Sequence, residues 1–362
     1  MITGNIVISA EWAVHRRLVY RGRVTVAIPP GARALAAAPQ DGMTGTTAPV
    51  TSVDTEELSA LVDVLGRGRV VVLGGAGLST ESGVPDYRGP TGIARNAQPM
   101  TYQEFTGSPE AQRRYWARSY AGWPVMHRVR PNAGHQAVAE LQRRGLVDAV
   151  VTQNVDRLHH AAGSDPVVEL HGTLHRVVCL ACRVVSDRAT VQERLAEANP
   201  GFEVSLFADT DGDTASVRPD GDVALAESMV AGFRPVECLD CGAGPLKPDV
   251  VFFGENVPKD RVTHCFALVD AARTLLVLGS SLTVMSGYRF VRHARKHGVG
   301  VVIVNRGPTR GDGDADLRLD APLGVTLTAA VQALAPASRP RGTRSEEIAD
   351  HSPAHGPSHR LP

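Results

Sequence analysis

The segment Arg69-Val-Val-Val-Leu-Gly-Gly-Ala-Gly-Leu-Ser79 joins a short apolar run to a glycine-rich loop. Its consecutive apolar residues, mostly β-branched, favour a strand buried on both faces. Glycines directly after such a strand let the backbone approach a pyrophosphate, and the free N–H groups of a following helix favour an anion. The spacing departs from the dehydrogenase fingerprint, since Thr80 stands where that fingerprint has Gly or Ala. By itself, the loop is a weak signal, and a tight turn that binds nothing is the alternative.

Similar apolar runs recur along the chain and alternate with helical patterns. The expected strands are 69–73, 147–152, 275–278 and 299–304, and the expected helices are 56–65, 134–143, 261–272 and 287–297. This alternation is typical of an α/β protein with a Rossmann-like, doubly wound parallel sheet. Ligands of such folds bind beyond the carboxyl ends of the strands.

The composition excludes several classes of protein. The 362 residues include 38 Lys or Arg and 38 Asp or Glu, so the net charge is zero. This balance argues against nucleic-acid binding through a general positive charge. The sequence has no run of about 18 apolar residues and predicts no membrane-spanning helix. Five cysteines in so long a chain do not make a disulfide scaffold, which favours an enzyme of a reducing compartment, with the cytoplasm as its expected location.

Two Cys-x-x-Cys pairs interrupt the α/β pattern and predict a metal site. Cys179 and Cys182 form one pair, and Cys238 and Cys241 form the other. Two such pairs supply the four thiolates of a closed tetrahedral zinc site, so we expect one structural Zn²⁺. Redox-active pairs are the competing interpretation, but two pairs in one insert favour zinc. Cys265, within an apolar helical pattern, is expected to be an inert core residue.

These patterns also suggest domain boundaries. Residues 1–50 combine prolines and an alanine run with weak periodicity, and we expect a disordered leader there, with Met43 as an alternative start. The folded domain is expected over 51–335, with the zinc module inserted over about 172–247. Residues 336–362 lack an apolar stripe and are expected to be a disordered tail.

Polar segments follow the expected strands. They are Thr-Gln-Asn-Val-Asp-Arg-Leu-His at 152–159, Glu-Leu-His-Gly-Thr at 169–173, Lys-Pro-Asp-Val-Val-Phe-Phe-Gly-Glu at 247–255, Gly-Ser-Ser-Leu at 279–282 and Asn-Arg-Gly at 305–307. Taken singly, Asn154 or Asp156 would more often be a loop cap than a ligand, and His171 would more often be structural. Together they bring amide, carboxylate and imidazole groups to the edge of the sheet where α/β proteins bind ligands.

In this order, the motifs resemble those of the sirtuins. The resemblance covers roughly residues 54–330 and includes Gly-Ala-Gly-Leu-Ser-Thr-Glu-Ser-Gly-Val-Pro-Asp-Tyr-Arg at 75–88, both cysteine pairs and the polar segments above. The Asp-Tyr-Arg ending, the long insert between the cysteine pairs with Pro-Asp-Gly-Asp-Val at 219–223, and Ser-Gly-Tyr-Arg at 286–289 are most similar to the class II branch. That branch includes the mitochondrial sirtuin associated with ADP-ribosyl transfer and with removal of lipoyl groups.

The resemblance implies an NAD site and a set of catalytic residues. The implied NAD-binding residues are Gly75, Ala76, Gly77, Ser79, Asp86, Tyr87, Arg88, Gln153, Asn154, Asp156, Gly279, Ser280, Ser281, Asn305, Gly307 and Asp316. The implied catalytic residues are His171, Asn154 and Asp156. Of these, His171 would be the general base, and an imidazole suits that role because its ordinary pKa of about 6.5 lies near neutrality.

The implied activity is NAD-dependent deacetylation or deacylation of protein lysines. NAD would be a consumed co-substrate, and the products would be nicotinamide, free lysine and O-acyl-ADP-ribose. The partners would be acyl-lysine proteins, whose peptides are expected to add as an extended strand between 252–255 and the loop near Met285. Val251 and Phe252 suit a core position equally well.

Other functions remain as alternatives. A protein mono-ADP-ribosyltransferase or a lipoamidase-type deacylase would use the same NAD pocket. A hydride-transferring dehydrogenase is disfavoured by the missing third glycine, and an inactive NAD-binding scaffold by the presence of His171 and Asn154. Desuccinylating sirtuins carry a Tyr and, three residues later, an Arg in the acyl pocket. Here the nearest residues are Ile93 with Arg95 or Asn96, so a preference for succinyl or malonyl groups has no support.

Overall fold

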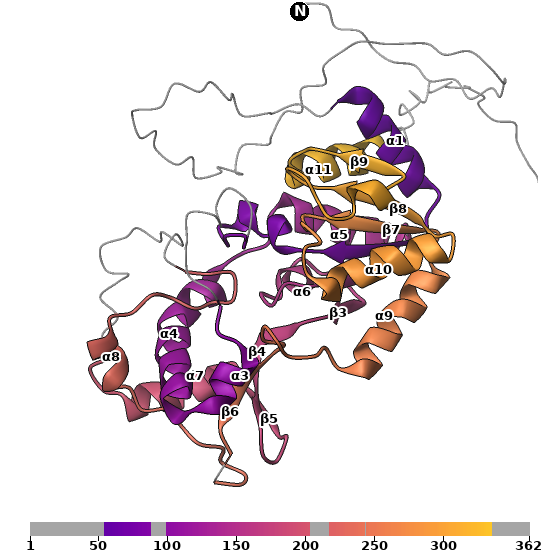
Figure 1. The fold of residues 1–362 in the computed structure, drawn as a ribbon. Helices are drawn as coiled ribbons and strands as arrows, with labels where there is room; N and C mark the ends of the chain where they lie inside the picture. The colour runs from indigo at the N-terminus through magenta and orange to yellow at the C-terminus, as the bar shows by residue number, and fades with distance from the viewer. Residues whose placement is uncertain (1–53, 88–98, 203–216, 243, 335–362) are drawn as a thin grey trace, which may run out of the picture.

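A six-stranded parallel sheet forms the centre of the larger of two lobes (Figure 1). The computed structural model describes residues 54–87, 99–202, 217–242 and 244–334. In spatial order the strands are β3 (Val167–Glu169), β2 (Val147–Thr152), β1 (Val70–Gly74), β7 (Thr274–Leu278), β8 (Gly300–Val304) and β9 (Leu317–Leu319). After β1, the chain adds β2 and β3 on one side of β1. It later adds β7, β8 and β9 on the other side. The switch point of this doubly wound sheet therefore lies between β1 and β7.

Helices cover both faces of this sheet, which explains why its central strands are mostly apolar. One face carries α1 (Thr55–Gly66), α5 (Ala133–Arg143) and α11 (Leu323–Ala333), and the other carries α9 (Lys259–Ala271) and α10 (Met285–Lys296). Side chains of β1 alternate between the two cores: Val70 and Val72 pack on the first face, and Val71 and Leu73 pack on the second. The Rossmann-like α/β fold expected from the sequence is confirmed.

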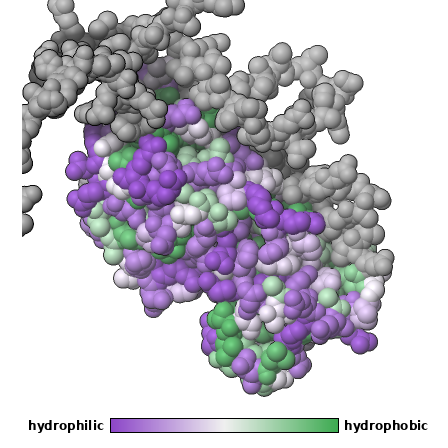
Figure 2. Space-filling view, turned by 180° about the vertical axis from the view of Figure 1, so that it is seen from behind, coloured by the Kyte–Doolittle hydropathy of each residue, from purple (hydrophilic) through white to green (hydrophobic). Residues whose placement is uncertain are grey.

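The smaller lobe holds an antiparallel sheet and the cysteines. Its strands, in the spatial order β5 (Val185–Asp187), β4 (Gly172–Cys179) and β6 (Leu246–Val250), pack with α3 (Tyr102–Gly107), α4 (Pro109–Arg128), α7 (Arg188–Ala198) and α8 (Glu227–Ala231). Figure 2 shows hydrophilic residues over much of the larger lobe and a group of hydrophobic residues at the free end of the smaller one.

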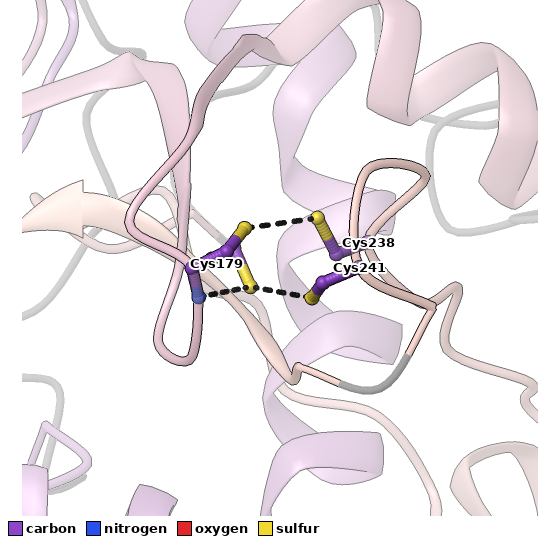
Figure 3. A group of neighbouring side chains, drawn as sticks. Cys179, Cys238 and Cys241 are labelled. Atoms are coloured by element: carbon purple, nitrogen blue, oxygen red, sulfur yellow. Dashed lines mark hydrogen bonds between the residues drawn. The ribbon is translucent and has the colours of Figure 1, made fainter.

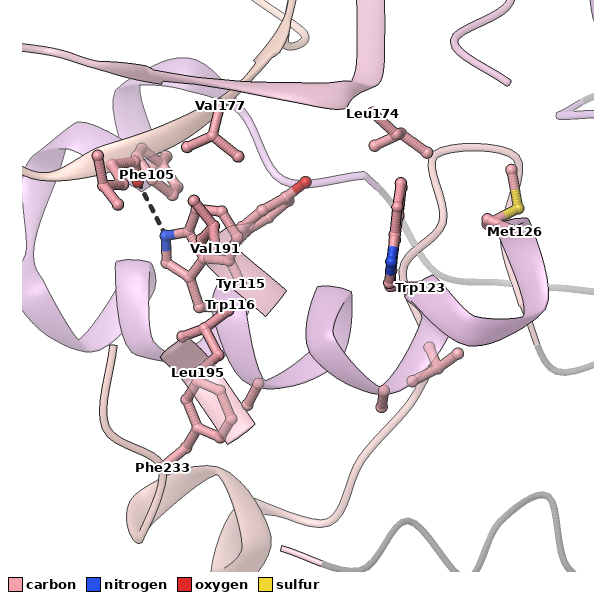
Figure 4. Close-up of a cluster of buried hydrophobic side chains, with 14 of the residues drawn as sticks. Phe105, Tyr115, Trp116, Trp123, Met126, Leu174, Val177, Val191, Leu195 and Phe233 are labelled. Atoms are coloured by element: carbon pink, nitrogen blue, oxygen red, sulfur yellow. Dashed lines mark hydrogen bonds between the residues drawn. The ribbon is translucent and has the colours of Figure 1, made fainter. Parts of the chain in front are cut away.

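Two separate insertions build this smaller lobe, whereas the sequence predicted only the one at about 172–247. The helices α3 and α4 lie between β1 and β2 in the chain, yet their side chains belong to the same core as β4 and β6 (Figure 4). Trp116 of α4 donates its indole N–H to the backbone oxygen of Leu246 at 2.8 Å. Aromatic rings of Phe105 and Tyr115 also stack on Phe252, which follows β6. The apolar pattern of α4 signals a helix but not the lobe against which it packs.

The expected elements agree with the observed ones to within two residues at each end. The short strands β3 and β9 and the helices α4 and α11 were not predicted. The leader, the tail and the segment around Ile93 lie outside the described residues. Among the described helices, none is long and apolar enough to span a membrane.

Two buried histidines lie behind the glycine loop. His135 of α5 and His159 of α6 (Leu158–Ala161) are at most 1% exposed, and their rings meet edge to face at 5.0 Å. Within the part of the chain that the structure describes, neither ring nitrogen of either residue has a hydrogen-bond partner. Burial lowers the pKa of His135 to about 4 and the pKa of His159 well below its ordinary value. Both imidazoles are therefore neutral at pH 7.

The free energy of unfolding is expected to fall as the pH drops from about 6.5 toward 4. In this window the unfolded chain binds protons at these histidines while the folded chain does not, so acid favours unfolding. The shift of His135 alone corresponds to about 3 kcal/mol at the acid end. Urea unfolding at a series of pH values should show a shallower pH slope for His135→Gln than for wild type. The exposed His264→Gln serves as control, and an unchanged slope in His135→Gln would contradict the assignment.

Candidate active site

A cavity of about 1010 Å³ lies at the carboxyl ends of the parallel strands, around the switch point. Fifteen of the residues predicted for the site line it: Gly75, Ala76, Gly77, Ser79, Asp86, Tyr87, Gln153, Asn154, Asp156, His171, Gly279, Ser280, Ser281, Asn305 and Gly307. They follow different strands of the larger lobe. Ligand cavities commonly measure about 300–1,000 Å³, so this one has room for a large ligand or for two.

Two glycine-containing loops form the floor of the cavity. The backbone N–H of Gly77 donates to the carbonyl oxygen of Gly279 at 2.8 Å, and that of Gly75 donates to Leu278 at 2.9 Å. A Cβ on Gly75 would lie 2.6 Å from the Cβ of Ser280, and a Cβ on Gly77 would lie 2.9 Å from the Cα of Gly279. Only glycine permits this approach. The short helix Ala76–Leu78 begins at this point.

A buried hydrogen-bond network connects the first loop with the end of β2. The amide nitrogen Nδ2 of Asn154 donates to the backbone oxygen of Gly75 and to Oγ of Ser79, both at 3.0 Å. Oγ of Ser79 in turn donates to Oδ2 of Asp156 at 2.6 Å, and the N–H of Leu158 donates to its Oδ1 at 2.9 Å. Burial raises the pKa of Asp156, while these hydrogen bonds oppose that shift. The network fixes the loop in place.

The second loop is tied to β2 through Gln153. Its Nε2 donates to Oγ of Ser280 at 3.0 Å and to the backbone oxygen of Gly74 at 3.2 Å. Residue 287 must be small, since a Cβ on Gly287 would lie 2.5 Å from the side-chain oxygen of Gln153. On the far side of the cavity, Nδ2 of Asn305 donates to the backbone oxygen of Gly307 at 3.0 Å and shapes the turn after β8.

His171, just beyond the end of β3, presents one ring nitrogen to the cavity as a proton acceptor. Its Nδ1 lies 3.0 Å from the backbone oxygen of Gln153, which only accepts, so Nδ1 carries the proton. The lone pair of Nε2 therefore accepts from Oγ of Ser286 at 2.9 Å. Burial, with a smaller contribution from Arg261 and Arg289, lowers the pKa of His171 to about 4 although the bond to Gln153 opposes the shift. The imidazole is neutral at pH 7 and is able to take up a proton.

Ser286 is a site residue that the sequence analysis missed. It was noted only as part of a branch-specific motif, and nothing in its spacing relates it to His171, which lies 115 residues earlier. The first turn of α10 places it over Nε2, and Arg289 of the same helix also lines the cavity. The signal in the sequence was its position shortly after the Gly-Ser-Ser loop at a helix start.

The segment after β6 forms the outer wall of the cavity. Phe252 packs in the core of the smaller lobe, as one of the two interpretations had it, while it also lines the cavity. Phe253 is 37% exposed, and its ring stacks edge to face on that of Tyr87 at 6.0 Å. The buried ammonium of Lys247 pairs with Glu255 at 3.0 Å and holds the turn closed. Two residues of the insert, Pro219 and Asp220, complete this wall.

Among the described residues, one predicted site residue lies away from the cavity. Asp316 lies at the opposite, amino edge of the sheet, where its carboxylate accepts from the N–H of Val301 at 2.8 Å and pairs with Arg295 at 2.6 Å. Its predicted contact with adenine has no support from this position, because β9 runs parallel to β8 and begins at that edge. Arg88 lies outside the described residues.

The four paired cysteines converge at one point of the smaller lobe (Figure 3). The Sγ atoms of Cys179 and Cys241 are 3.7 Å apart, and so are those of Cys182 and Cys238. Four thiolates at about 2.3 Å from one tetrahedral ion would have sulfurs about 3.8 Å apart, far from the roughly 2.0 Å of a disulfide. The four side chains therefore fit a structural zinc ion. Cys265 is fully buried in the core of the larger lobe, as expected.

Cys179→Ser is expected to abolish zinc binding and destabilise the smaller lobe, since structural zinc binding is coupled to folding. Elemental analysis should fall from one zinc per chain to near zero, and limited proteolysis should cut between β4 and β6. The matched control is Cys265→Ala, which removes a cysteine outside the cluster and should retain its zinc. A zinc-replete, protease-resistant Cys179→Ser protein would refute the prediction.

Comparisons with known proteins agree with this geometry. A family model described as Sir2 family matches residues 75–286. The chain is 57% identical to NAD-dependent protein deacetylase 1 of Streptomyces coelicolor over 76% of this chain and 89% of that one. It is 45% identical to NAD-dependent protein deacylase Sirt4 of Drosophila melanogaster over 77% of this chain and 87% of that one.

Solved structures show the same fold. A Sir2 variant with a deacetylated p53 peptide and 3′-O-acetyl ADP ribose is 30% identical, with a TM-score of 0.60 over 76% of this chain and 98% of that one. A Sir2 complex with a p53 peptide and NAD⁺ is also 30% identical, with a TM-score of 0.58 over the same shares. The family match spans more than half of this chain and includes the cysteine cluster and most of the residues that line the cavity. The chain belongs to the Sir2 family, the sirtuins.

Proposed function

We propose that the protein is an NAD-dependent protein-lysine deacetylase or deacylase that releases nicotinamide, free lysine and O-acyl-ADP-ribose. The observation that carries this proposal is the position of His171. A neutral imidazole, whose Nε2 lone pair accepts from Ser286 in this structure, faces the same cavity as the glycine loop that would hold a pyrophosphate. The names of the similar proteins agree with this activity.

The chain offers distinct groups for each part of NAD. The loop at Ala76 and Gly77, with Ser280, would hold the phosphates, and Asn305 would contact the adenosine; all of them line the cavity. Gln153 would contact the nicotinamide ribose, and Asn154 and Asp156 would contact the nicotinamide. NAD itself supplies the electrophilic carbon and carries the acyl group away.

His171 is placed to remove a proton from a ribose hydroxyl group. Its Nδ1–H is held by the carbonyl of Gln153, so the ring keeps one orientation and one tautomer. The positive charge that the ring gains on protonation is stabilised by that carbonyl, which accepts from Nδ1. General-base catalysis of this kind contributes about 10²–10⁴-fold to a rate. Ser286 occupies Nε2 in this structure and must yield that position to the hydroxyl.

An acyl-lysine peptide is proposed to enter between Phe253 and Met285. Phe253 is 37% exposed and Met285 is 42% exposed at the rim, and both follow segments that line the cavity. Extended peptides bind such rims through backbone hydrogen bonds, which suits a substrate chosen mainly by its modified lysine. Similar structures contain peptides, including a propionylated one.

We further propose that the chain belongs to the branch of sirtuins whose deacylases accept unusual acyl groups. The identity to the Drosophila deacylase and the Pro219–Asp220 wall of the cavity support this assignment. ADP-ribosyl transfer is the alternative outcome of the same pocket. The cytoplasmic location also remains a prediction.

The test is turnover of zinc-loaded protein with NAD and a panel of acyl-lysine peptides. Mass spectrometry of the products should show nicotinamide and O-acyl-ADP-ribose. ADP-ribose attached to protein instead would favour the transferase. Absence of nicotinamide release with every peptide would overturn the proposal.

His171→Ala is expected to lower kcat by at least about 10²-fold, because the general base is lost. Zinc content and the melting temperature should stay near wild type. His264→Ala removes an exposed histidine from α9 and should retain full turnover. If His171→Ala keeps wild-type kcat, another group acts as the base.

Ser286→Ala is expected to shift the acidic limb of kcat/KM to higher pH. The hydroxyl donates to the lone pair of neutral His171, which favours the neutral ring and lowers its pKa. Burial, the main cause of the lowered pKa of His171, persists in the variant, but loss of this donor is expected to raise the pKa, so activity is lost at a higher pH. A pH profile from 4 to 9 checks this, with equal kcat/KM at pH 8 as the internal control. Superimposable profiles would show that Ser286 does not act on the base.

A further inference from the structure

Three side chains with metal-binding atoms meet on the surface of the larger lobe, away from the cavity and the cysteines. Asp270 lies near the end of α9, His293 lies in the last turn of α10, and His297 directly follows α10. One ring nitrogen from each histidine and one carboxylate oxygen lie within 4.8 Å of one another. Nε2 of His293 is 2.6 Å from Oδ1 of Asp270.

The fold places the negative ends of two helix dipoles at this point. The helix α9 leads into β7 and α10 leads into β8, and these strands are parallel neighbours. The two helices therefore run side by side in the same direction and end together at the amino edge of the sheet (Figure 1). The free carbonyl groups at helix C-termini favour a cation. The cavity lies at the opposite edge.

The two imidazoles are held in positions suited to a shared ion. His293 and His297 are one helical turn apart, and their rings lie 4.0 Å from each other. The ring of Phe266 also packs against that of His293, with 4.4 Å between the ring centroids. Nδ1 of His297 donates to the backbone oxygen of His293 at 2.9 Å, which leaves Nε2 with the lone pair. Histidines that bind metals typically use their second nitrogen in this way.

The bond between His293 and Asp270 accounts for only part of this arrangement. An exposed pair of this kind contributes little to stability and does not explain why the second ring is stacked on the first. Two imidazoles and one carboxylate are the donor set of many zinc, nickel and iron sites. Ligand distances of about 2.0–2.2 Å require the three atoms to approach by small side-chain rotations. Asp270 and His297 are exposed, and His293 is partly buried.

We propose that Asp270, His293 and His297 form a second metal site, which binds a divalent transition-metal ion such as zinc and joins the C-terminal ends of α9 and α10. The ion replaces the proton that His293 shares with Asp270. Water fills its remaining positions. The site is separate from the structural cysteine site in location and in donor type.

The experiment is equilibrium dialysis of full-length, zinc-loaded protein against increasing concentrations of ZnCl₂, with bound metal measured by elemental analysis. Wild type should bind one zinc per chain more than either His293→Ala or His297→Ala. The matched control His264→Ala removes an exposed histidine from α9 outside the cluster, and it should bind as much zinc as wild type. The histidines at 351, 355 and 359 are present in every variant, so any zinc that they bind cancels in the difference.

Two further readouts distinguish loss of the site from loss of the fold. All variants should keep the zinc of the cysteine site and wild-type deacylation without added metal, because these residues touch neither centre. Added zinc should raise the melting temperature of wild type and of His264→Ala more than that of His293→Ala or His297→Ala. Equal zinc content in wild type and in both cluster variants would overturn the proposal, as would equal thermal shifts.

Discussion

The loop after β1 and the loop after β7 touch through their backbones, and the whole site depends on this contact. Gly77 donates to Gly279 with no room for a side chain on either residue. Because β1 and β7 flank the switch point, these loops are the ones that a dinucleotide would span. A side chain at either glycine would separate them and displace Ser280, to which Gln153 is bonded. The positions of the side chains that would recognise a ligand thus depend on the backbone contact between the two loops.

The polar groups of the site largely satisfy one another without a ligand. Asn154, Ser79 and Asp156 form one chain of hydrogen bonds, and Gln153, His171 and Ser286 form another. Buried polar groups that lack hydrogen-bond partners raise the free energy of the folded state. These networks therefore lower the free-energy cost of folding the site, and they also keep it ordered. They also hold each donor before the substrates arrive, which reduces the entropy lost on binding.

The sequence predicted the larger lobe better than the smaller one for a physical reason. Local sequence patterns predict buried parallel strands and amphipathic helices. Once a parallel sheet is predicted, the loops after its strands are expected to meet at one edge and form the site. The partnership of Trp116 with Leu246 joins residues 130 positions apart and has no local signature. Ser286 was missed for the same reason, because only the folded structure brings the start of α10 against His171. Asp316 was assigned to the site only by the resemblance, and the direction of β9 places it at the other edge of the sheet.

The origin of the smaller lobe in two insertions has a mechanical consequence. One insertion leaves and rejoins the larger lobe between β1 and β2, and the other between β3 and β7, while both share one apolar core. A lobe tethered by a single pair of strands could swivel freely about it. This one is anchored at two places along the edge of the sheet, so twisting would strain one anchor against the other. Bending that opens and narrows the gap between the lobes is the softer motion, and it leaves the register of the facing walls intact.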